Sequence, residues 1–398
     1  MERVAILSAV RTPIAKFLGS YADLGAAELG GIATRAAIER SGLAPGDVDE
    51  LIYGCARQAG GGPNMARQVL VRSGIPHERP AFTVNQACAS GLQSILIGAE
   101  RIRHGRARVV LAGGAENMTR VPYYLDRARL GYRLGHAPVV DGMYRDGFLD
   151  PICGLVMGET AERLARLHGI SRREQDEYAL ESQRRAAEAQ RAGRFADELI
   201  AVEVPGRKGE SRRVEADEHP RPGATLEELA KLPPVFLEDG TVTAGNASGI
   251  TDGAASIVLA AESLARERGA TPLGWVGESE TVGVDPSIMG IGPVPATRAL
   301  LARTGRTLSD YGLIELNEAF AAQVLACDRE LGLDRSRVNV NGGAIALGHP
   351  IGCTGARIVT TLVHEMARRG AGLGLATLCV SGGLGLAVEI ERNQEGSR

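Results

Sequence analysis

The sequence predicts an α/β protein of two similar halves, with a large inserted segment in the first half. Three features support this prediction: the length of the chain, an internal repeat, and a long segment of different composition. At 398 residues the chain is too long for one ordinary hydrophobic core, so two or three domains are expected. Hydrophobic residues make up 44% and aromatic residues 4%, which is typical of a globular protein with an aliphatic core.

The repeat consists of two pairs of segments separated by nearly the same number of residues. Residues 34–54, "TRAAIERSGLAPGDVDELIYG", resemble residues 297–317, "TRALLARTGRTLSDYGLIELN". Residues 91–114 likewise resemble residues 355–383, and both end in Gly-Gly. Each segment is typical of a helix, a glycine or basic-glycine stop and a buried strand. Repeated helix–strand units of this size predict two similar α/β halves packed against each other.

The remaining elements complete this division. The first strand is expected within residues 1–14, where a short alternating apolar stretch follows two charged residues and does not resemble a signal peptide. Residues 121–248 are richer in Arg, Tyr, Asp and Pro, and include an amphipathic helix that Ser171 and Glu174 cap. We therefore expect an N-terminal half (1–120 plus 249–270), an inserted loop or substrate domain (121–248) and a C-terminal half (271–398).

Charge and cysteine spacing exclude several classes of protein. A net charge of -3 gives no general attraction to nucleic acid or to an anionic membrane, and no apolar run approaches the length of a membrane span. Six cysteines occur without C-x-x-C spacing, so neither a zinc site nor a disulfide framework is expected. These features favour a protein of the reducing cytoplasm without a bound metal.

Four residues at the ends of predicted strands or the starts of helices are candidates for chemistry. Cys88 in "NQACASGLQ" (85–93) precedes a predicted helix, whose free N–H groups lower a thiol pKa and stabilise an oxyanion. His349, Cys379 and Asn317 lie at three similar junctions, where ligands collect in α/β sheets. Taken singly, each has a simpler explanation: a buried thiol, a structural histidine or a helix N-cap.

The repeat strengthens the catalytic interpretation of two of these residues. Under the spacing of the second pair, Asn85 corresponds to His349 and Cys88 corresponds to Gly352. A pseudo-twofold axis between the halves would bring the cysteine loop and the histidine loop together.

These motifs resemble the thiolase family, and more closely its acetyl-CoA acetyltransferase type. The resemblance covers essentially the whole chain, because five motifs occur in the family's order and spacing: "NQACASGLQ" (85–93), "AGNASGITDGA" (244–254), "NEAFAAQ" (317–323), "NGGAIALGHPIGCTGAR" (341–357) and "LCVSGGLG" (378–385). It implies a duplicated five-layer αβαβα fold with an inserted loop domain, which agrees with the repeat.

The resemblance also implies roles for individual residues. Cys88 matches the nucleophile, His349 its base, Cys379 the acid/base for the second substrate, and Asn317 the holder of a water at an oxyanion site. The backbone N–H groups of Cys88 and of the region of Ser381 match a second oxyanion site. The positions that match coenzyme A or pocket contacts are Arg221, Ser248, Leu149, Met157, Ala244, Ala319 and Phe320. Of these, Arg221 is also consistent with a solvated arginine, and Leu149 and Met157 with plain core.

Two positions depart from the family pattern. Val156 stands where short-chain biosynthetic thiolases often have histidine, which weakens the expectation of a strict four-carbon substrate. Ser381 stands where many relatives have a glycine, and it would be strained if the turn required positive φ.

The expected function is therefore reversible Claisen condensation of two acetyl-CoA to acetoacetyl-CoA and CoA. Alternatives are a broader-range 3-ketoacyl-CoA thiolase of fatty-acid degradation, a decarboxylating condensing enzyme, and a non-catalytic acyl-CoA binding protein. Cys379 argues against the condensing enzyme, and the presence of Cys88 and His349 argues against the binder. We expect coenzyme A as substrate or product rather than as a permanent cofactor, acyl-CoA as the partner without nucleic acid or membrane, and a homodimer or homotetramer.

Overall fold

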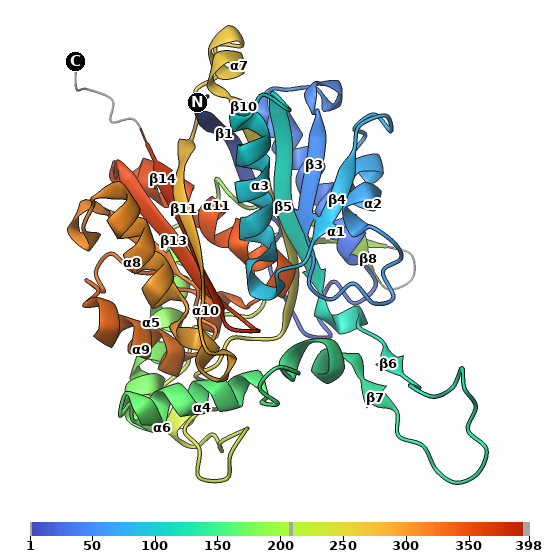
Figure 1. Ribbon diagram of the computed structural model, residues 1–398, viewed down its shortest axis with the longest axis vertical. Helices are drawn as coiled ribbons and strands as arrows, with labels where there is room; N and C mark the ends of the chain where they lie inside the picture. Colours follow the sequence, from blue (N-terminus) through green and yellow to red (C-terminus); the bar gives the residue numbers. More distant parts are fainter. Residues whose placement is uncertain (1, 207–209, 393–398) are drawn as a thin grey trace.

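The computed structural model describes residues 2–206 and 210–392, and a large mixed β-sheet runs through its centre (Figure 1). The strands follow the order β12-β13-β14-β11-β1-β10-β5-β3-β4, with the short β2 paired to β10. In chain order these strands are β1 (Val4–Arg11), β2 (Ala15–Lys16), β3 (Glu50–Gly54), β4 (Ala81–Val84), β5 (Val109–Asn117), β10 (Thr251–Ala261), β11 (Gly274–Gly283), β12 (Leu313–Leu316), β13 (Leu373–Val380) and β14 (Leu384–Glu391).

The two halves of this sheet have the same topology, so the sequence repeat is a structural repeat. The order β3-β5-β10-β1 in the first half corresponds to β12-β13-β14-β11 in the second. In each half the first pair is parallel and the next two pairs are antiparallel. The halves meet where β1 pairs antiparallel with β11, from Val4↔Val276 to Ile6↔Gly274. This arrangement agrees with the predicted pseudo-twofold relation.

Helices cover both faces of the sheet and fill the space between its halves (Figure 1). The helices are α1 (Ala26–Ser41), α2 (Met65–Arg72), α3 (Ser90–Arg103), α4 (Met157–Leu167), α5 (Arg172–Arg191), α6 (Leu226–Ala230), α7 (Glu262–Glu267), α8 (Pro293–Thr304), α9 (Ala321–Leu331), α10 (Ala344–Leu347) and α11 (Ile351–Arg369). The helices α1 and α8 of the repeat end at Gly42 and Gly305, whose φ angles are 73° and 67°. Such left-handed ends favour glycine, as the sequence predicts.

Helices α3 and α11 pack closely at the centre, and two equivalent glycines make this possible. A Cβ at Gly91 would lie 2.8 Å from the carbonyl oxygen of Gly352, and a Cβ at Gly355 would collide with the backbone of Leu92. Both glycines lie near the starts of their helices, and the absence of a Cβ at each allows the two helix starts to approach closely. The loops that precede α3 and α11 are therefore neighbours, as the repeat predicts.

The first strand lies where the sequence predicts it, and it has no exposed face. All eight residues of β1 are buried, because the strand lies in the middle of the sheet with layers on both faces. A central strand of this kind has no solvent-facing side, so even its polar residues Ser8 and Arg11 are buried.

The inserted segment lies at the strand ends of both halves and carries a projecting arm (Figure 1). It contains α4, α5 and α6, a hairpin of β8 (Val202–Pro205) and β9 (Ser211–Val214), and the arm between β6 (Tyr123–Tyr124) and β7 (Val140–Asp141). The predicted capping box begins α5, since the Ser171 N–H donates to Glu174 Oε2 at 2.7 Å. We propose that the chain consists of the three predicted parts: an N-terminal half (1–120 plus 249–270), an inserted loop domain (121–248) and a C-terminal half (271–398). Within the described residues, no helix is both long and apolar enough to cross a membrane.

Candidate active site

A cavity of about 460 Å³ lies where the inserted segment meets both halves of the fold. Most of the predicted site residues line it: Cys88, His349, Arg221, Ser248, Met157, Ala244, Ala319 and Phe320. Three predicted residues do not. Leu149 is 41% exposed and pairs with Val156 through an isolated β-bridge, whereas Cys379 and Asn317 are buried behind the wall.

Cys88 lies in a tight turn that directly precedes α3. The turn spans Ala87–Ala89, and Ala87 has a φ of 45°, which alanine rarely adopts. Ser90 stabilises it, because its hydroxyl donates to the Ala87 carbonyl at 2.7 Å and accepts from the Gln86 N–H at 2.9 Å. Backbone strain of this kind is characteristic of functional turns. The thiol is thereby held in the cavity wall with only 9% of the residue exposed.

Opposing effects act on the Cys88 thiol. Burial raises its pKa above the ordinary value, whereas the charge of Arg57 and the backbone N–H groups of Ser381 and Cys88 itself lower it. Groups that stabilise a thiolate are also suited to an oxyanion that forms on a carbon attached to the same sulfur. Of the two halves of the fold, Cys88 comes from the first and Ser381 from the second.

The turn after β13 accommodates Ser381 without backbone strain. Its left-handed positions are Gly382 and Gly383, with φ of 88° and 82°, and Ser381 is not among the residues with positive φ. Serine therefore fits at this position of the turn, where many relatives have glycine, and its Cβ causes no backbone strain. The backbone N–H of Ser381 is kept as a donor.

His349 is held as a neutral imidazole with one nitrogen free. Its Nδ1 lies 2.6 Å from Thr354 Oγ1, and that hydroxyl donates its one proton to the Pro350 carbonyl at 3.0 Å. Nδ1–H must therefore be the donor to Thr354, which leaves a lone pair on Nε2. Nε2 has no hydrogen-bond partner among the described residues. Burial, followed by the charges of Arg357 and Arg57, lowers the His349 pKa to about 3, so the imidazole is uncharged at neutral pH.

Replacing Thr354 by valine is expected to lower kcat about fivefold with little change in KM. The substitution removes the acceptor that fixes the tautomer, and one hydrogen bond contributes about 1 kcal/mol. Steady-state kinetics would measure the effect, with Thr354→Ser as the control because it retains the hydroxyl. Equal kcat values in the valine and serine variants would contradict this role.

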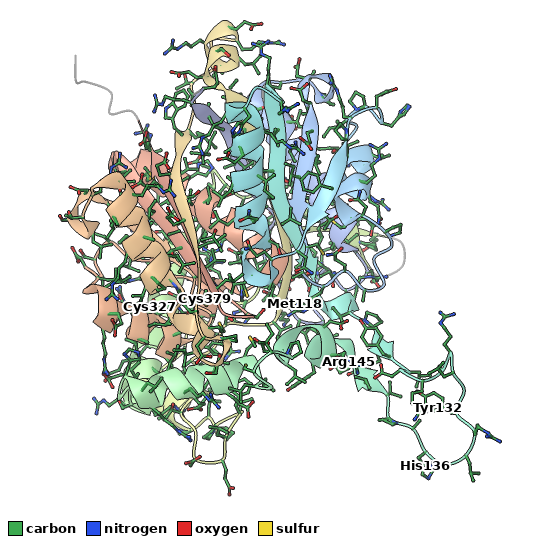
Figure 2. The ribbon with its side chains drawn as sticks, in the orientation of Figure 1. Met118, Tyr132, His136, Arg145, Cys327 and Cys379 are labelled. Atoms are coloured by element: carbon green, nitrogen blue, oxygen red, sulfur yellow. The ribbon has the colours of Figure 1, made fainter. Side chains whose placement is uncertain are left out.

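Cys379 and Asn317 lie behind the cavity wall. Cys379 is fully buried near the end of β13 (Figure 2), and both burial and the nearby Cys88 thiol raise its pKa. Asn317 follows β12, and its backbone N–H donates to the Thr377 carbonyl at 3.0 Å. Neither atom of its carboxamide has a protein partner among the described residues. A buried amide in this state favours a polar ligand or a water, because an unmade hydrogen bond is costly.

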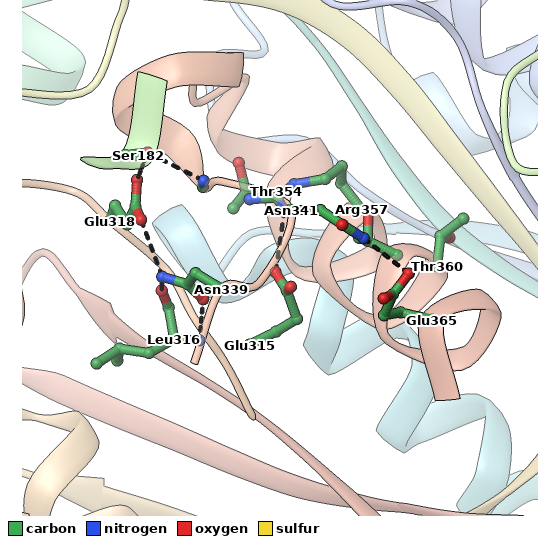
Figure 3. A network of polar contacts seen from close by, with 12 residues as sticks. Ser182, Glu315, Leu316, Glu318, Asn339, Asn341, Thr354, Arg357, Thr360 and Glu365 are labelled. Atoms are coloured by element: carbon green, nitrogen blue, oxygen red, sulfur yellow. Dashed lines mark hydrogen bonds and ion pairs between the residues drawn. The ribbon is translucent and has the colours of Figure 1, made fainter. Parts of the chain in front are cut away.

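A buried polar network holds the segment around Asn317 in place (Figure 3). The Glu318 carboxylate accepts from the hydroxyl of Ser182 at 2.7 Å and from Asn339 Nδ2 at 3.0 Å. Asn339 in turn accepts from the Leu316 N–H at 2.9 Å and donates to the Leu316 carbonyl at 2.8 Å. These contacts connect α5 of the inserted segment to the strand end that presents Asn317. Fully bonded networks of this kind give a rigid local structure.

Sequence reasoning missed three residues that shape the site: Thr354, Glu116 and Arg57. The buried Glu116 carboxylate accepts from the N–H groups of Ala56 and Arg57 at 3.0 Å and of Gly352 at 2.8 Å, so it ties the loop after β3 to the start of α11. Arg57 lines the cavity beside Cys88. Its position just after a buried strand was the available signal, because ligands collect at strand ends in such sheets.

The cavity is basic as well as apolar. Lys16 and Arg221 are exposed and so lie at its mouth, and His219 lies in its wall, where its Nδ1 donates to the Ala346 carbonyl at 2.8 Å. Among the described residues, none that lines the cavity is an aspartate or a glutamate. A basic entrance with an apolar interior suits an elongated ligand with an anionic end.

Comparison with known proteins assigns the family. Residues 4–263 match the family model "Thiolase, N-terminal domain", and residues 270–392 match "Thiolase, C-terminal domain". The chain belongs to the thiolase family. The resemblance predicted from the five motifs is thereby confirmed.

Relatives of this thiolase cover its full length. It is 50% identical over 393 residues to an acetyl-CoA acetyltransferase from Pseudomonas aeruginosa, covering 99% of this chain and 100% of the relative. An acetyl-CoA acetyltransferase from Cupriavidus necator is 48% identical, with 98% of this chain and 100% of the relative covered.

Solved structures confirm the predicted fold class. The acetyl-CoA acetyltransferase of Bacillus anthracis superimposes with a TM-score of 0.96 at 45% identity, covering 98% of this chain and 99% of that one. Human mitochondrial 3-ketoacyl-CoA thiolase in complex with CoA gives a TM-score of 0.94 at 44% identity, covering 98% of each chain.

Proposed function

We propose that this thiolase is an acetyl-CoA C-acetyltransferase, which interconverts two acetyl-CoA with acetoacetyl-CoA and CoA through an acyl group on Cys88. Full-length relatives with this name, whose sequences are 48–50% identical to this chain, support the proposal. The observation that carries it is the convergence on one cavity of a thiol from the first half and a free imidazole nitrogen from the second. A non-catalytic binding protein would not need this pairing.

In the first half-reaction, the Cys88 thiol gives its proton to His349 Nε2, and the thiolate attacks the thioester carbon. The N–H groups of Cys88 and Ser381 stabilise the tetrahedral oxyanion, an effect typically worth about 10²–10³ in rate per donor. The carbon–sulfur bond to CoA then breaks, and the departing CoA thiolate takes the proton from His349. The acetyl group remains on Cys88.

In the second half-reaction, Cys379 acts as the base. Its thiolate takes a proton from the methyl group of a second acetyl-CoA, and the resulting carbanion attacks the acetyl carbon on Cys88. His349, with a water on the Asn317 carboxamide, stabilises the enolate oxygen. The bond to Cys88 breaks, the Cys88 thiolate takes the proton that Cys379 removed from the methyl group, and acetoacetyl-CoA leaves with both sulfurs restored to their starting states. In the cleavage direction, Cys379 returns the proton.

Coenzyme A is the substrate that fits the cavity. We infer that the basic mouth, with Lys16 and Arg221, faces the phosphates, and that Ser248 contacts the pantetheine. Met157, Ala244, Ala319 and Phe320, for which apolar contacts are predicted, line the same cavity as Cys88, whereas the contact of Leu149 remains a prediction. A solved relative contains CoA, which supports this placement. The reaction uses no permanently bound cofactor.

The decisive experiment compares CoA-dependent cleavage of acetoacetyl-CoA and 3-ketohexanoyl-CoA. Faster cleavage of acetoacetyl-CoA is expected for an acetyltransferase. Similar rates on both would favour the broader-range 3-ketoacyl-CoA thiolase of fatty-acid metabolism, which Val156 allows because its side chain adds no polar contact to the cavity wall. No cleavage of either by folded protein would contradict the proposal.

The projecting arm supports a homotetramer. Its tip exposes large apolar side chains, among them Leu130 at 83% and Leu134 at 101% exposure, and Figure 2 shows Tyr132 and His136 far from the body. Contiguous exposed apolar residues mark interaction sites.

The cysteines are all free, which supports a location in the reducing cytoplasm.

Replacing Leu130 and Leu134 together by aspartate is expected to reduce the molar mass of the assembly, measured by light scattering after size-exclusion chromatography. Two carboxylates would have to be desolvated in the contact. Arg129→Asp serves as a control for added negative charge alone. An unchanged mass in the double variant would contradict the role of the arm.

A further inference from the structure

Arg57 carries a positive charge that the mechanism above does not use. The residue is 9% exposed and lines the cavity together with Cys88 and His349. Its Nε is buried without a hydrogen-bond partner among the described residues, and none of the other cavity-lining residues that the structure describes is acidic. A buried charge without a partner is costly, so such a group is retained where something compensates it.

The protein is shaped around the Arg57 guanidinium. The group lies against Gly147, in the turn Tyr144–Phe148, so closely that a Cβ there would collide with its Nε, Cζ and Nη2 atoms. Gly147 has no positive φ, so the backbone conformation does not require glycine. The guanidinium instead occupies the space that a Cβ at Gly147 would fill, so a larger residue there would displace it. The inserted segment thus packs directly against the guanidinium.

Arg57 also shares a rigid frame with both catalytic loops. Glu116 binds the N–H of Arg57 and the N–H of Gly352 with the two oxygens of one carboxylate. Gly352 is the second residue of α11, which begins just after His349. The backbone of Arg57 is therefore fixed relative to His349 and, through the packing of α3 on α11, relative to Cys88.

We propose that Arg57 is a further functional residue of this site, and that its guanidinium stabilises the negative charge that forms at Cys88 during acyl transfer. The proposal rests on the function proposed above, in which the thiolate, the tetrahedral oxyanion and the enolate are all anions of this cavity. Arg57 exchanges no atom with the substrate. Its partner is the anion that each step creates.

The electrostatics agree with this geometry. The charge of Arg57 lowers the pKa of Cys88, opposing burial, and also lowers the pKa of His349. The first effect favours the thiolate, and the second favours the uncharged imidazole. No other arginine acts on Cys88 among the causes of its shift, and the Glu116 carboxylate opposes Arg57 by raising the same pKa.

The test is the pH dependence of Cys88 alkylation by iodoacetamide, followed by peptide mass spectrometry. Arg57→Met, which keeps much of the side-chain length, is expected to raise the alkylation midpoint by about one pH unit and to slow acetyl-enzyme formation about tenfold. Arg57→Lys, which keeps the charge, should recover most of both. Gly147→Ala, which displaces the guanidinium without removing it, should shift the midpoint in the same direction by less.

Arg221→Met provides the matched control, because it removes a second arginine from the same cavity. We expect it to raise KM for CoA while leaving the alkylation midpoint in place. Unmoved midpoints in both Arg57→Met and Gly147→Ala would overturn the proposal, as would equal losses in Arg57→Met and Arg57→Lys without a shift. Should Arg57→Met fail to fold, the Gly147→Ala midpoint decides. Full activity of Cys88→Ala would instead refute the proposed function.

Discussion

Replacing Cys88 by alanine is expected to lower kcat for CoA-dependent cleavage of acetoacetyl-CoA by at least about 10⁴-fold. The substitution removes the sulfur that carries the acyl group, and the Cβ of alanine cannot form a covalent intermediate. Because Cys88 is only 9% exposed and alanine is smaller, the fold should be retained. Kinetics with acetoacetyl-CoA measure the loss, and the melting temperature reports on folding.

The Cys88→Ser variant separates chemistry from packing. Serine has nearly the same shape, but its hydroxyl is far less acidic than a thiol, so a loss of similar size is expected. Binding of CoA to both variants, followed by calorimetry, should stay near the wild-type affinity. Activity above a tenth of wild type in Cys88→Ala would exclude Cys88 as the nucleophile.

Replacing Cys379 by alanine is expected to separate the two half-reactions. Without the second sulfur, the methyl group of the incoming acetyl-CoA has no base, so condensation and cleavage should fall about 10²–10⁴-fold. Transfer of the acetyl group from acetyl-CoA to Cys88 needs only His349 and should persist. Single-turnover formation of the acetyl-enzyme measures the first step, and steady-state kinetics measure the second.

Cys327 offers a matched control for this variant. It is buried in a neighbouring apolar cluster (Figure 2), it acts on the pKa of Cys379, and its thiol contacts the Gly290 carbonyl at 3.4 Å. Cys327→Ala should therefore reproduce the packing defect without the chemical one. Similar kinetics in Cys379→Ala and Cys327→Ala would show that Cys379 is a core residue.

Much of the architecture could be predicted because the repeat carries structural information at defined positions. Gly91 and Gly355 occupy equivalent places in the two halves, and both are small because α3 and α11 touch there. Gly42 and Gly305 likewise end equivalent helices. The complete burial of β1 was harder to predict from the sequence, because the position of a strand within a sheet depends on partner strands that are distant in the sequence.

The site could be predicted in part. Motifs identified Cys88 and His349, which line one cavity. Their supporting groups were missed, since Thr354 and Glu116 are identified by hydrogen bonds that only the folded chain reveals. Arg57 differs, because its significance comes from the absence of a partner among the described residues. A sequence shows an arginine but not whether its charge is paired.

The most direct test of the account is mass spectrometry of the wild-type protein after brief incubation with acetyl-CoA and acid quench. The account predicts one acetyl group on the peptide that contains Cys88, which disappears when CoA is added before the quench. The absence of an adduct on an enzyme that still cleaves acetoacetyl-CoA, or an acetyl group on Cys379 instead, would contradict it.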